Sequence, residues 1–313
     1  MRQPHYPVIF CALCTIFACG TPGNQTPAEE PLEESGSREI PFDFERNQII
    51  LTVSMNDEGP FYMFLDTGGN PSAVDLTAAR EAGIPLDTTA AGEAEGVGGE
   101  PIPIYAAQIT TLRLGETVVG DVDAVALSLN HISARLGRPL HGVLGYSLLK
   151  DRIVQIDYRN RRIRIFADQP PEPQEGSQRV SFPLQFRAGS TIPLLEDFYV
   201  NGQQLRVTLD TGSSLALELF PWAIEQLGLE QQWEQATASS VVGARGEAAV
   251  REGRVESVRI GSIELGEQPV VFAEKERDDS EREGGNLGNA LLKHFLLTLD
   301  YKNGEVQLEL VQQ

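Results

Sequence analysis

The sequence predicts a mostly β protein built from two similar lobes, and three observations support this. The chain of 313 residues carries 30 glycines and 19 prolines, a composition typical of a turn-rich β fold. Its second half repeats motifs of the first at an offset of 143 to 146 residues. Within each copy, short apolar runs end at turn residues, as strands do. The length allows each copy its own hydrophobic core.

The internal repeat is the most informative of these observations. Residues 64–69 (FLDTGG) recur as residues 208–213 (TLDTGS). Three further segments recur in the same order: residues 109–115 as 255–261, residues 142–145 as 285–288, and residues 157–160 as 300–303. Four collinear matches indicate the duplication of a unit of about 125–130 residues, far longer than a solenoid repeat.

The seam between the two copies is rich in Pro, Glu and Gln, and residues 168–178 are typical of a linker. We therefore expect a first lobe over residues 42–168, a linker over 169–179 and a second lobe over 180–313. Fully extended, the linker reaches roughly 35 Å, enough to let the two lobes meet within one chain. We expect a monomer on this ground, with a homodimer that pairs lobes between chains as the alternative.

The elements of the first lobe follow from its apolar runs and turn residues. Residues 48–54 predict a strand, residues 56–60 a turn, and residues 61–65 a second strand. A short helix is expected over residues 74–82, with Ser72 as its N-terminal cap and Gly83 at its end.

The second lobe repeats this order. The pair Asn201-Gly202 predicts a hairpin between residues 198–200 and 205–209. A helix is expected to begin near Pro221, a favourable first-turn residue, and to end at Gly228. Each lobe also has one glycine-rich turn, at residues 96–99 and 243–246.

The N-terminus predicts secretion. The apolar run over residues 8–18 is too short to span a bilayer, which takes roughly 20 residues, and it is typical of a secretory signal peptide. Residues 16–20 (IFACG) resemble a bacterial lipobox, which predicts a signal peptide over residues 1–18 and lipidation at Cys19. An ordinary signal peptide with a chance cysteine is the alternative. Residues 19–41 would form a disordered tether, and the protein would lie in the cell envelope, at the outer membrane or the periplasmic face.

Composition and spacing exclude several other classes. The formal net charge of −20 argues against nucleic acid as a partner, because phosphate binding needs clustered Lys and Arg. The three cysteines all lie in the first 19 residues, so the folded part would hold no disulfide and no catalytic thiol. His131, His141 and His294 do not share a metal-ligand spacing, and phosphate-loop and dinucleotide fingerprints are absent. We expect neither a metal nor an organic cofactor.

The sharpest motif is Asp-Thr-Gly, which follows an apolar strand once in each copy, at Asp66 and at Asp210. Here the chain resembles the aspartic peptidase superfamily, particularly bacterial retropepsin-like proteins. Residues 143–145 and 286–288 resemble the hydrophobic-hydrophobic-Gly element of that family, with Asn286 as a departure. The resemblance covers nearly all of residues 42–311 and implies two β-barrel-like lobes with short helices, in a pseudo-twofold arrangement.

The resemblance also implies a catalytic dyad. Two carboxyl groups in contact cannot both ionise cheaply, so Asp66 and Asp210 would share one proton. The ionised member would take a proton from a water molecule, and the protonated member would hydrogen-bond the scissile carbonyl of a peptide or protein substrate. A non-catalytic lipoprotein that keeps the fold and holds a peptide is the alternative.

The remaining motif residues would support the two active-site loops. The resemblance implies that Thr67 and Thr211 lock the loops together, while Gly68 and Gly212 turn the backbone and present amides to the carboxylates. Ser213 follows the second motif, whereas Gly69 follows the first and would make the dyad asymmetric. The glycine-rich turns lie where the family carries its flap, but neither contains a tyrosine, and a plain surface turn is the alternative for both.

Overall fold

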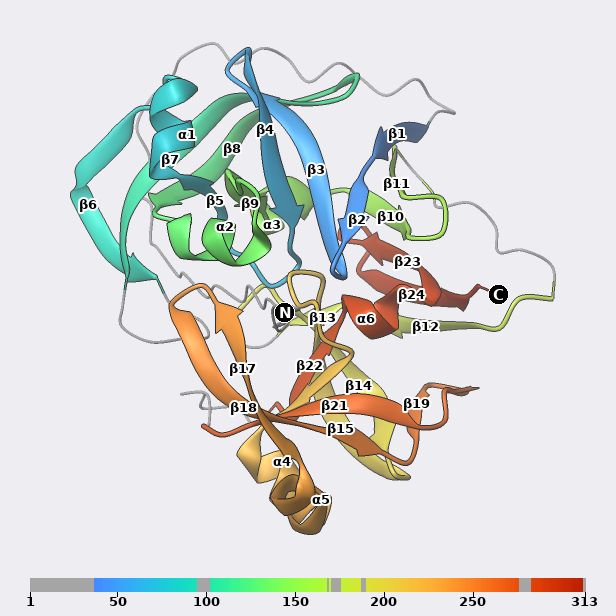
Figure 1. The fold of residues 1–313 in the computed structure, drawn as a ribbon. Helices are drawn as coiled ribbons and strands as arrows, with labels where there is room; N and C mark the ends of the chain where they lie inside the picture. Colours follow the sequence, from blue (N-terminus) through green and yellow to red (C-terminus); the bar gives the residue numbers. More distant parts are fainter. Residues whose placement is uncertain are drawn as a thin grey trace.

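The computed structural model describes residues 37–94, 102–167, 169, 176–186, 190–275 and 283–311. These residues form two lobes of β-sheet with short helices, joined by a third sheet to which both lobes contribute (Figure 1). The predicted all-β fold with two repeated lobes is confirmed. No helix in the described ranges is long and apolar enough to cross a membrane.

The first lobe is built on an eight-stranded sheet that curls on itself. Its strands, in spatial order, are β2 (Asp43–Glu45), β3 (Gln48–Met55), β4 (Glu58–Leu65), β9 (Gly142–Leu144), β5 (Ser72–Asp75), β8 (Thr117–Leu127), β7 (Ile102–Leu114) and β6 (Leu86–Ala94). An additional pairing of β3 with β7 bends the sheet towards a barrel. Helices α1 (Leu76–Glu81), α2 (Asn130–Leu136) and α3 (Tyr146–Leu149) belong to this lobe.

The second lobe repeats the arrangement. Its main sheet runs β17 (Thr237–Gly243), β18 (Gly246–Val255), β21 (Gln268–Ala273), β16 (Leu217–Leu219), β22 (Gly285–Gly288), β15 (Gln203–Asp210), β14 (Pro193–Val200), β19 (Val258–Ile260) and β20 (Ile263–Glu264), with β13 (Gln185–Phe186) beside β14. Helices α4 (Pro221–Gln226), α5 (Glu230–Gln235) and α6 (Asn289–Leu292) complete it. Residues 142–145 and 285–288 have the pattern Gly-x-Leu-Gly, and in each lobe the strand formed there pairs in parallel with the strand that precedes Asp-Thr-Gly. The pairs are β4 with β9 and β15 with β22.

The third sheet joins the lobes within one chain. Its order is β1 (Ser37–Pro41), β11 (Arg162–Phe166), β10 (Ile153–Asp157), β23 (Phe295–Asp300), β24 (Glu305–Leu310) and β12 (Arg179–Pro183). The central pairing, β10 with β23, is antiparallel and runs from Ile153 opposite Asp300 to Asp157 opposite Leu296. Each lobe thus contributes one hairpin, and the two hairpins share backbone hydrogen bonds.

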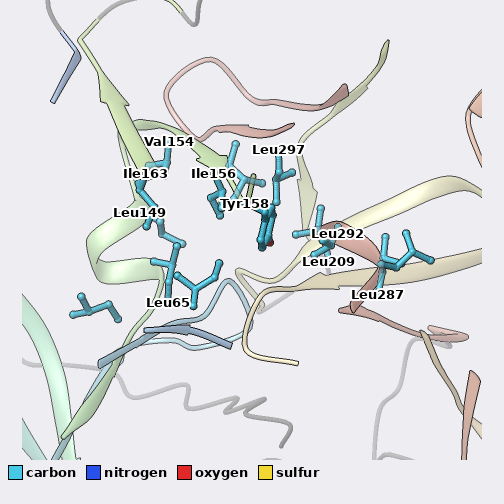
Figure 2. Close-up of a cluster of buried hydrophobic side chains, with 14 of the residues drawn as sticks. Leu65, Leu149, Val154, Ile156, Tyr158, Ile163, Leu209, Leu287, Leu292 and Leu297 are labelled. Atoms are coloured by element: carbon cyan, nitrogen blue, oxygen red, sulfur yellow. The ribbon is translucent and has the colours of Figure 1, made fainter. Parts of the chain in front are cut away.

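Above this sheet lies a continuous apolar core. Figure 2 shows Leu65 and Leu209, the residues that precede the two aspartates, in one cluster with side chains of β10 and β23 such as Ile156 and Leu297. All four side chains are buried. The cluster therefore anchors both Asp-Thr-Gly loops to the sheet that joins the lobes.

Two predicted boundaries are wrong. Residues 37–41 were expected in the tether, but they form β1, in which Ile40 lies opposite Ile163 of β11. The segment holds few apolar residues, but Ile40 is buried and the backbone is paired along the edge of an existing sheet. Amino-acid composition does not reveal such pairing. The linker was expected to run to residue 179, but Arg179 already begins β12. Residues 1–36 and 170–175, with the predicted signal peptide, Cys19 and most of the linker, lie outside the described residues.

The first predicted helix starts too early. Residues 72–75 form β5, and α1 begins at Leu76 with Asp75 as its cap, whose Oδ1 accepts a hydrogen bond from the Thr77 amide at 2.8 Å. Ser72 is not a cap, because its hydroxyl is hydrogen-bonded to that of Ser147 and also accepts from the Gly145 amide. The helix thus begins where the parallel pairing of β5 with β8 ends.

The predicted elements of the second lobe agree better with the structure. Helix α4 begins at Pro221, and Gly228 takes a left-handed φ of 65° just past its end. Asn201 and Gly202 connect β14 to β15 with φ values of 49° and 78°, the two positive angles that a type I′ turn requires. Helix α5 was not predicted.

Candidate active site

The two Asp-Thr-Gly loops meet where the lobes join. Asp66 directly follows β4, and its amide donates to the Leu144 carbonyl at 2.9 Å, while Asp210 is the last residue of β15. Both aspartates are completely buried. The two turns have the same backbone hydrogen bond, from Gly69 N to Asp66 O and from Ser213 N to Asp210 O, each at 3.2 Å. The repeat thus produces two loops of one geometry that face each other.

The two threonines lock the loops together through four hydrogen bonds. The amide of each threonine donates to the hydroxyl of the other at 3.0 Å. Each hydroxyl in turn donates across the interface, Thr67 Oγ1 to Leu209 O at 2.7 Å and Thr211 Oγ1 to Leu65 O at 3.1 Å. Because both threonines are buried, these bonds fix the distance and angle between the loops without competition from water.

Backbone amides support both carboxyl groups. Asp66 Oδ1 accepts from the Gly68 amide at 2.7 Å. Asp210 Oδ1 accepts from two amides, those of Gly212 at 2.9 Å and Ser213 at 3.1 Å. Hydrogen bonds to a carboxylate favour its charged form, so the amides of both loops favour ionisation of the pair.

The two carboxyl groups share one small space, which the glycines leave open. A Cβ atom on Gly212 would lie 2.3 Å from Asp66 Cγ, and one on Gly68 would lie 3.1 Å from Asp210 Oδ1. Each loop therefore lies close to the aspartate of the other loop. At Gly212 the distance is too short for any side chain on that residue.

Burial and the second carboxyl group raise the pKa of Asp66 well above its ordinary value. Burial is the larger cause, followed by the negative charge of Asp210, and a hydrogen bond with the Asp210 side chain acts in the same direction. The amides of Gly68 and Gly212 oppose the shift but do not cancel it. The pair therefore favours a state with one proton, which the two carboxyl groups hold as one unit.

The residue after the Asp-Thr-Gly motif has a hydroxyl side chain in the second loop, where it is Ser213, and no side chain in the first, where it is Gly69. Ser213 is buried, and its hydroxyl accepts from the Leu215 amide at 3.3 Å. A Cβ atom on Gly69 would lie 3.4 Å from Asp66 Oδ2, an ordinary contact distance. The first loop could therefore accommodate a side chain that it lacks.

Sequence reasoning missed three residues that hold the second loop from other elements. The Gln48 side-chain amide, at the start of β3, donates to the Gly212 carbonyl at 2.9 Å. The Asn289 amide donates to the Thr211 carbonyl at 2.6 Å, and the Tyr158 hydroxyl donates to Asn289 Oδ1 at 2.8 Å. Gln48 and Tyr158 belong to the first lobe, so they tie it to the loop of the second. The repeat carried one signal for this network, because Asn289 stands where the first copy has Tyr146.

The Gly-x-Leu-Gly elements lie directly beneath the two loops. A Cβ atom on Gly145 would lie 2.1 Å from the Gly69 carbonyl oxygen, and one on Gly288 would lie 2.8 Å from the Ser213 carbonyl oxygen. The departure at Asn286 has polar partners, because Asn286 Oδ1 accepts from the Thr208 hydroxyl and its amide donates to Glu218 Oε2 at 3.1 Å.

The glycine-rich turn of the second lobe is not a plain surface turn. Val242 and Ala244, at the tip of the β17–β18 hairpin, are buried against apolar side chains of the first lobe, and the Gly243 carbonyl lies 3.2 Å from His131 Nε2. The hairpin therefore spans both lobes. The corresponding turn of the first lobe, residues 96–99, lies outside the described residues.

Two of the histidines, His131 and His141, make structural contacts. His131 contacts the hairpin tip, and His141 Nδ1 accepts from the Tyr62 amide at 2.8 Å. Within the described part of the chain, no group of three or more His, Cys, Asp or Glu residues is arranged to hold a metal ion.

Comparison with known families agrees with this geometry. The sequence matches the family of aspartyl proteases over residues 51–148 and again over residues 197–291, once in each lobe. Together the matches cover more than half of the chain, and each contains one Asp-Thr-Gly motif. No curated protein matches the chain. The chain belongs to the aspartyl protease family, with one copy of the family's domain in each lobe.

Proposed function

We propose that the protein is an aspartic endopeptidase, which hydrolyses peptide bonds with a water molecule activated by Asp66 and Asp210. The observation behind this proposal is that two buried aspartates share one small space, since a Cβ atom on Gly68 would lie 3.0 Å from Asp66 Oδ1 and 3.1 Å from Asp210 Oδ1. Burial and the charge of Asp210 raise the pKa of Asp66 in this space. The threonine bonds hold this arrangement, which would be unfavourable without support.

The raised pKa of Asp66 supports a role as the proton donor of the pair, with Asp210 as the base. Asp210, whose carboxylate accepts two amides, takes a proton from the water as its oxygen attacks the scissile carbonyl carbon. Asp66 donates its proton to the carbonyl oxygen, which gives a tetrahedral diol. The diol then collapses: the proton on Asp210 passes to the leaving nitrogen, and one hydroxyl proton returns to Asp66. The C–N bond breaks, and the dyad recovers its single shared proton.

The roles require no metal and no organic cofactor, because the dyad both activates the nucleophile and polarises the carbonyl. Activity should therefore be the same with and without EDTA. Inhibition by EDTA that added Zn²⁺ or Mg²⁺ reverses would contradict this scheme.

The test of the function is a digest of a peptide library by residues 37–313, with the cleaved bonds identified by mass spectrometry. The Asp210→Asn variant is expected to cut no bond that the wild type cuts. Asp123→Asn is the matched control, since the Asp123 side chain is 64 % exposed and pairs only at 3.8 Å with Lys150. Peptides bound but left intact by the wild type would favour the peptide-binding alternative.

We further propose that the protein works as a monomer anchored by lipid at Cys19. The β10–β23 pairing and the threonine lock join the lobes within one chain, which supports a complete site in each molecule. The anchor is supported by residues 16–20 of the sequence. Specific activity should not change on dilution, and Cys19→Ser should abolish lipid labelling and release the protein from membranes. Unchanged membrane association would contradict the lipidation.

A further inference from the structure

Two side-chain amides bond the loop that carries Asp210 from behind. The Gln48 amide donates to the Gly212 carbonyl at 2.9 Å, and the Asn289 amide donates to the Thr211 carbonyl at 2.6 Å. A carbonyl only accepts hydrogen bonds, so in both cases the NH₂ end of the side chain faces the backbone. Gln48, Asn289 and Thr211 are completely buried, so water does not compete for these bonds.

The two carbonyls belong to the peptide groups that bond Asp210. A peptide group is planar and joins the carbonyl of one residue to the N–H of the next. The Thr211 carbonyl is therefore rigidly joined to the Gly212 N–H, and the Gly212 carbonyl to the Ser213 N–H. These two N–H groups donate to Asp210 Oδ1, at 2.9 Å and 3.1 Å. Each side-chain amide thus bonds the far end of a peptide group whose near end bonds the carboxyl group.

Hydrogen bonds in such a chain strengthen one another. A donor at the carbonyl end polarises the peptide group, which makes its N–H a better donor to a negative charge, by about 10–30 % per bond. The Tyr158 hydroxyl extends one of the chains by donating to Asn289 Oδ1 at 2.8 Å, so every donor in that chain points towards the dyad. The Gly212 amide also lowers the pKa of Asp66, so the same chain acts on both carboxyl groups.

The first loop has neither side-chain amide at the matching positions of the repeat. At an offset of 144 residues, Gln48 corresponds to Ile192, and at an offset of 143, Asn289 corresponds to Tyr146. The Tyr146 ring instead packs edge-to-face against the Tyr301 ring, with centroids 5.9 Å apart. The two amides therefore distinguish the second loop from the first, although both turns have the same backbone hydrogen bond.

We propose that Gln48 and Asn289 are positioning residues of the dyad, which aim and polarise the two peptide N–H groups that stabilise negative charge on Asp210. This inference rests on the proposed function, since it concerns the same dyad. Without either amide, one peptide group loses the bond at its far end, and negative charge on the pair becomes less stable. The first ionisation of the pair then takes place at a higher pH.

The other ionisable groups around the loop stay in place when an amide is removed. Burial raises the pKa of the Tyr158 and Tyr301 hydroxyls, so both remain neutral at acidic pH. Arg46 and Lys293 are hydrogen-bonded to polar atoms of the first lobe. Glu218 lies on β16, two strands from β15. A shift between the wild type and an amide variant therefore reports on the amide.

The test is the pH dependence of kcat/KM for Gln48→Met and Asn289→Leu, which nearly keep the side-chain volume but have no amide. Each should move the acidic limb of the profile to higher pH by about 0.2–0.5 units. Each should also lower kcat about two- to tenfold with little change in KM, because neither side chain touches the substrate in this proposal. Gln48→Glu keeps the shape and donates to the Gly212 carbonyl only while protonated, so its activity should approach the wild type at low pH and fall behind as pH rises.

Gln155→Met is the matched control. Gln155 is also a buried glutamine, but its amide donates to the Thr298 hydroxyl in the sheet that joins the lobes. This variant should lower the melting temperature and leave the acidic limb where it is. A lower melting temperature in Gln48→Met without a shift of the acidic limb, or an equal shift in Gln155→Met, would overturn the proposal.

Titration of the dyad separates this inference from the proposed function. The apparent pKa values of the pair are followed by NMR of the aspartate carboxyl carbons, without substrate. If no peptide is cut but Gln48→Met raises the lower apparent pKa of the pair, the hydrolytic function fails and the positioning role stands. If peptides are cut and neither Gln48→Met nor Asn289→Leu raises that pKa, the function stands and the positioning role fails.

Discussion

Substitution of Gly212 by alanine tests the geometry of the dyad most sharply. The new Cβ atom would lie 2.3 Å from Asp66 Cγ and 2.5 Å from both carboxyl oxygens. Since ordinary contacts begin near 3.4 Å, the Asp66 carboxyl group or the second loop must move by about 1 Å. Such overpacking costs about 1–3 kcal/mol of stability, and a misplacement of about 1 Å costs roughly 100-fold in rate.

Gly69→Ala is the matched control in the opposite loop. Its Cβ atom would approach the same carboxyl group, but at 3.4 Å from Oδ2, which requires no movement. Neither glycine has a left-handed φ, so the comparison isolates the steric effect from backbone strain. We expect Gly212→Ala to lower kcat/KM about 100-fold and Gly69→Ala to change it less than about threefold.

The assay is kcat/KM on one peptide from the library digest, with the melting temperature of each variant measured alongside. A lowered melting temperature with lost activity fits the steric account. Wild-type activity in Gly212→Ala, or equal losses in both variants, would show that the loops do not approach as closely as the structure has them.

Three further predictions concern the surroundings of the dyad. Because burial and Asp210 raise the folded-state pKa of Asp66, its contribution to stability is present below its ordinary pKa of 3.8 and is lost as pH rises through the raised value. Activity should also fall as pH rises through the raised value. Asp66→Asn should stabilise the fold more at neutral pH than at pH 3.8. Equal shifts of the melting temperature at both pH values would contradict the raised pKa. Tyr158→Phe should lower the free energy of unfolding in urea by about 1 kcal/mol and lower kcat, since Asn289 loses a hydrogen bond. Tyr301→Phe should be nearly neutral, because the buried Tyr301 hydroxyl has no hydrogen-bond partner among the described residues. Equal effects of the two variants would reject a role for the Asn289 bond. Thr211→Val removes a hydroxyl that donates one hydrogen bond to the other lobe and accepts another from it, which should lower the free energy of unfolding by about 2–3 kcal/mol. Thr211→Ser keeps the hydroxyl and should avoid this loss. An equal loss of stability in both variants would show that the hydroxyl bonds are not the cause.

Much of the site could be predicted because the repeat is visible in the sequence. The offset places Asp66 and Asp210 at matching positions. The apolar runs before them are strands, and the loops that follow these strands are hydrogen-bonded to each other. Short-range signals also worked where the chemistry is local. The Asn201-Gly202 pair needs two positive φ angles that few other residues accept, and Pro221 is favoured in a first helical turn.

The failures came from contacts that a single strand does not reveal. Residues 37–41 look like a tether by composition, and they become a strand because β11 offers an unpaired edge. Ser72 has the chemistry of a helix cap, but Ser147, far along the chain, uses its hydroxyl. Asn289 and Gln48 act through backbone carbonyls of the second loop, and amides in such roles leave no spacing pattern.

The central claim is that Asp66 and Asp210 act as one catalytic unit, and a double-mutant cycle tests it directly. Asp66→Asn, Asp210→Asn and the double variant are compared with the wild type for kcat/KM on one peptide, with folding checked by thermal melting. Members of a single dyad are not additive, so each single variant should lose about 10⁴-fold or more, and the double variant should lose no more than either. Substantial activity in one single variant, or losses that multiply in the double variant, would contradict the shared dyad.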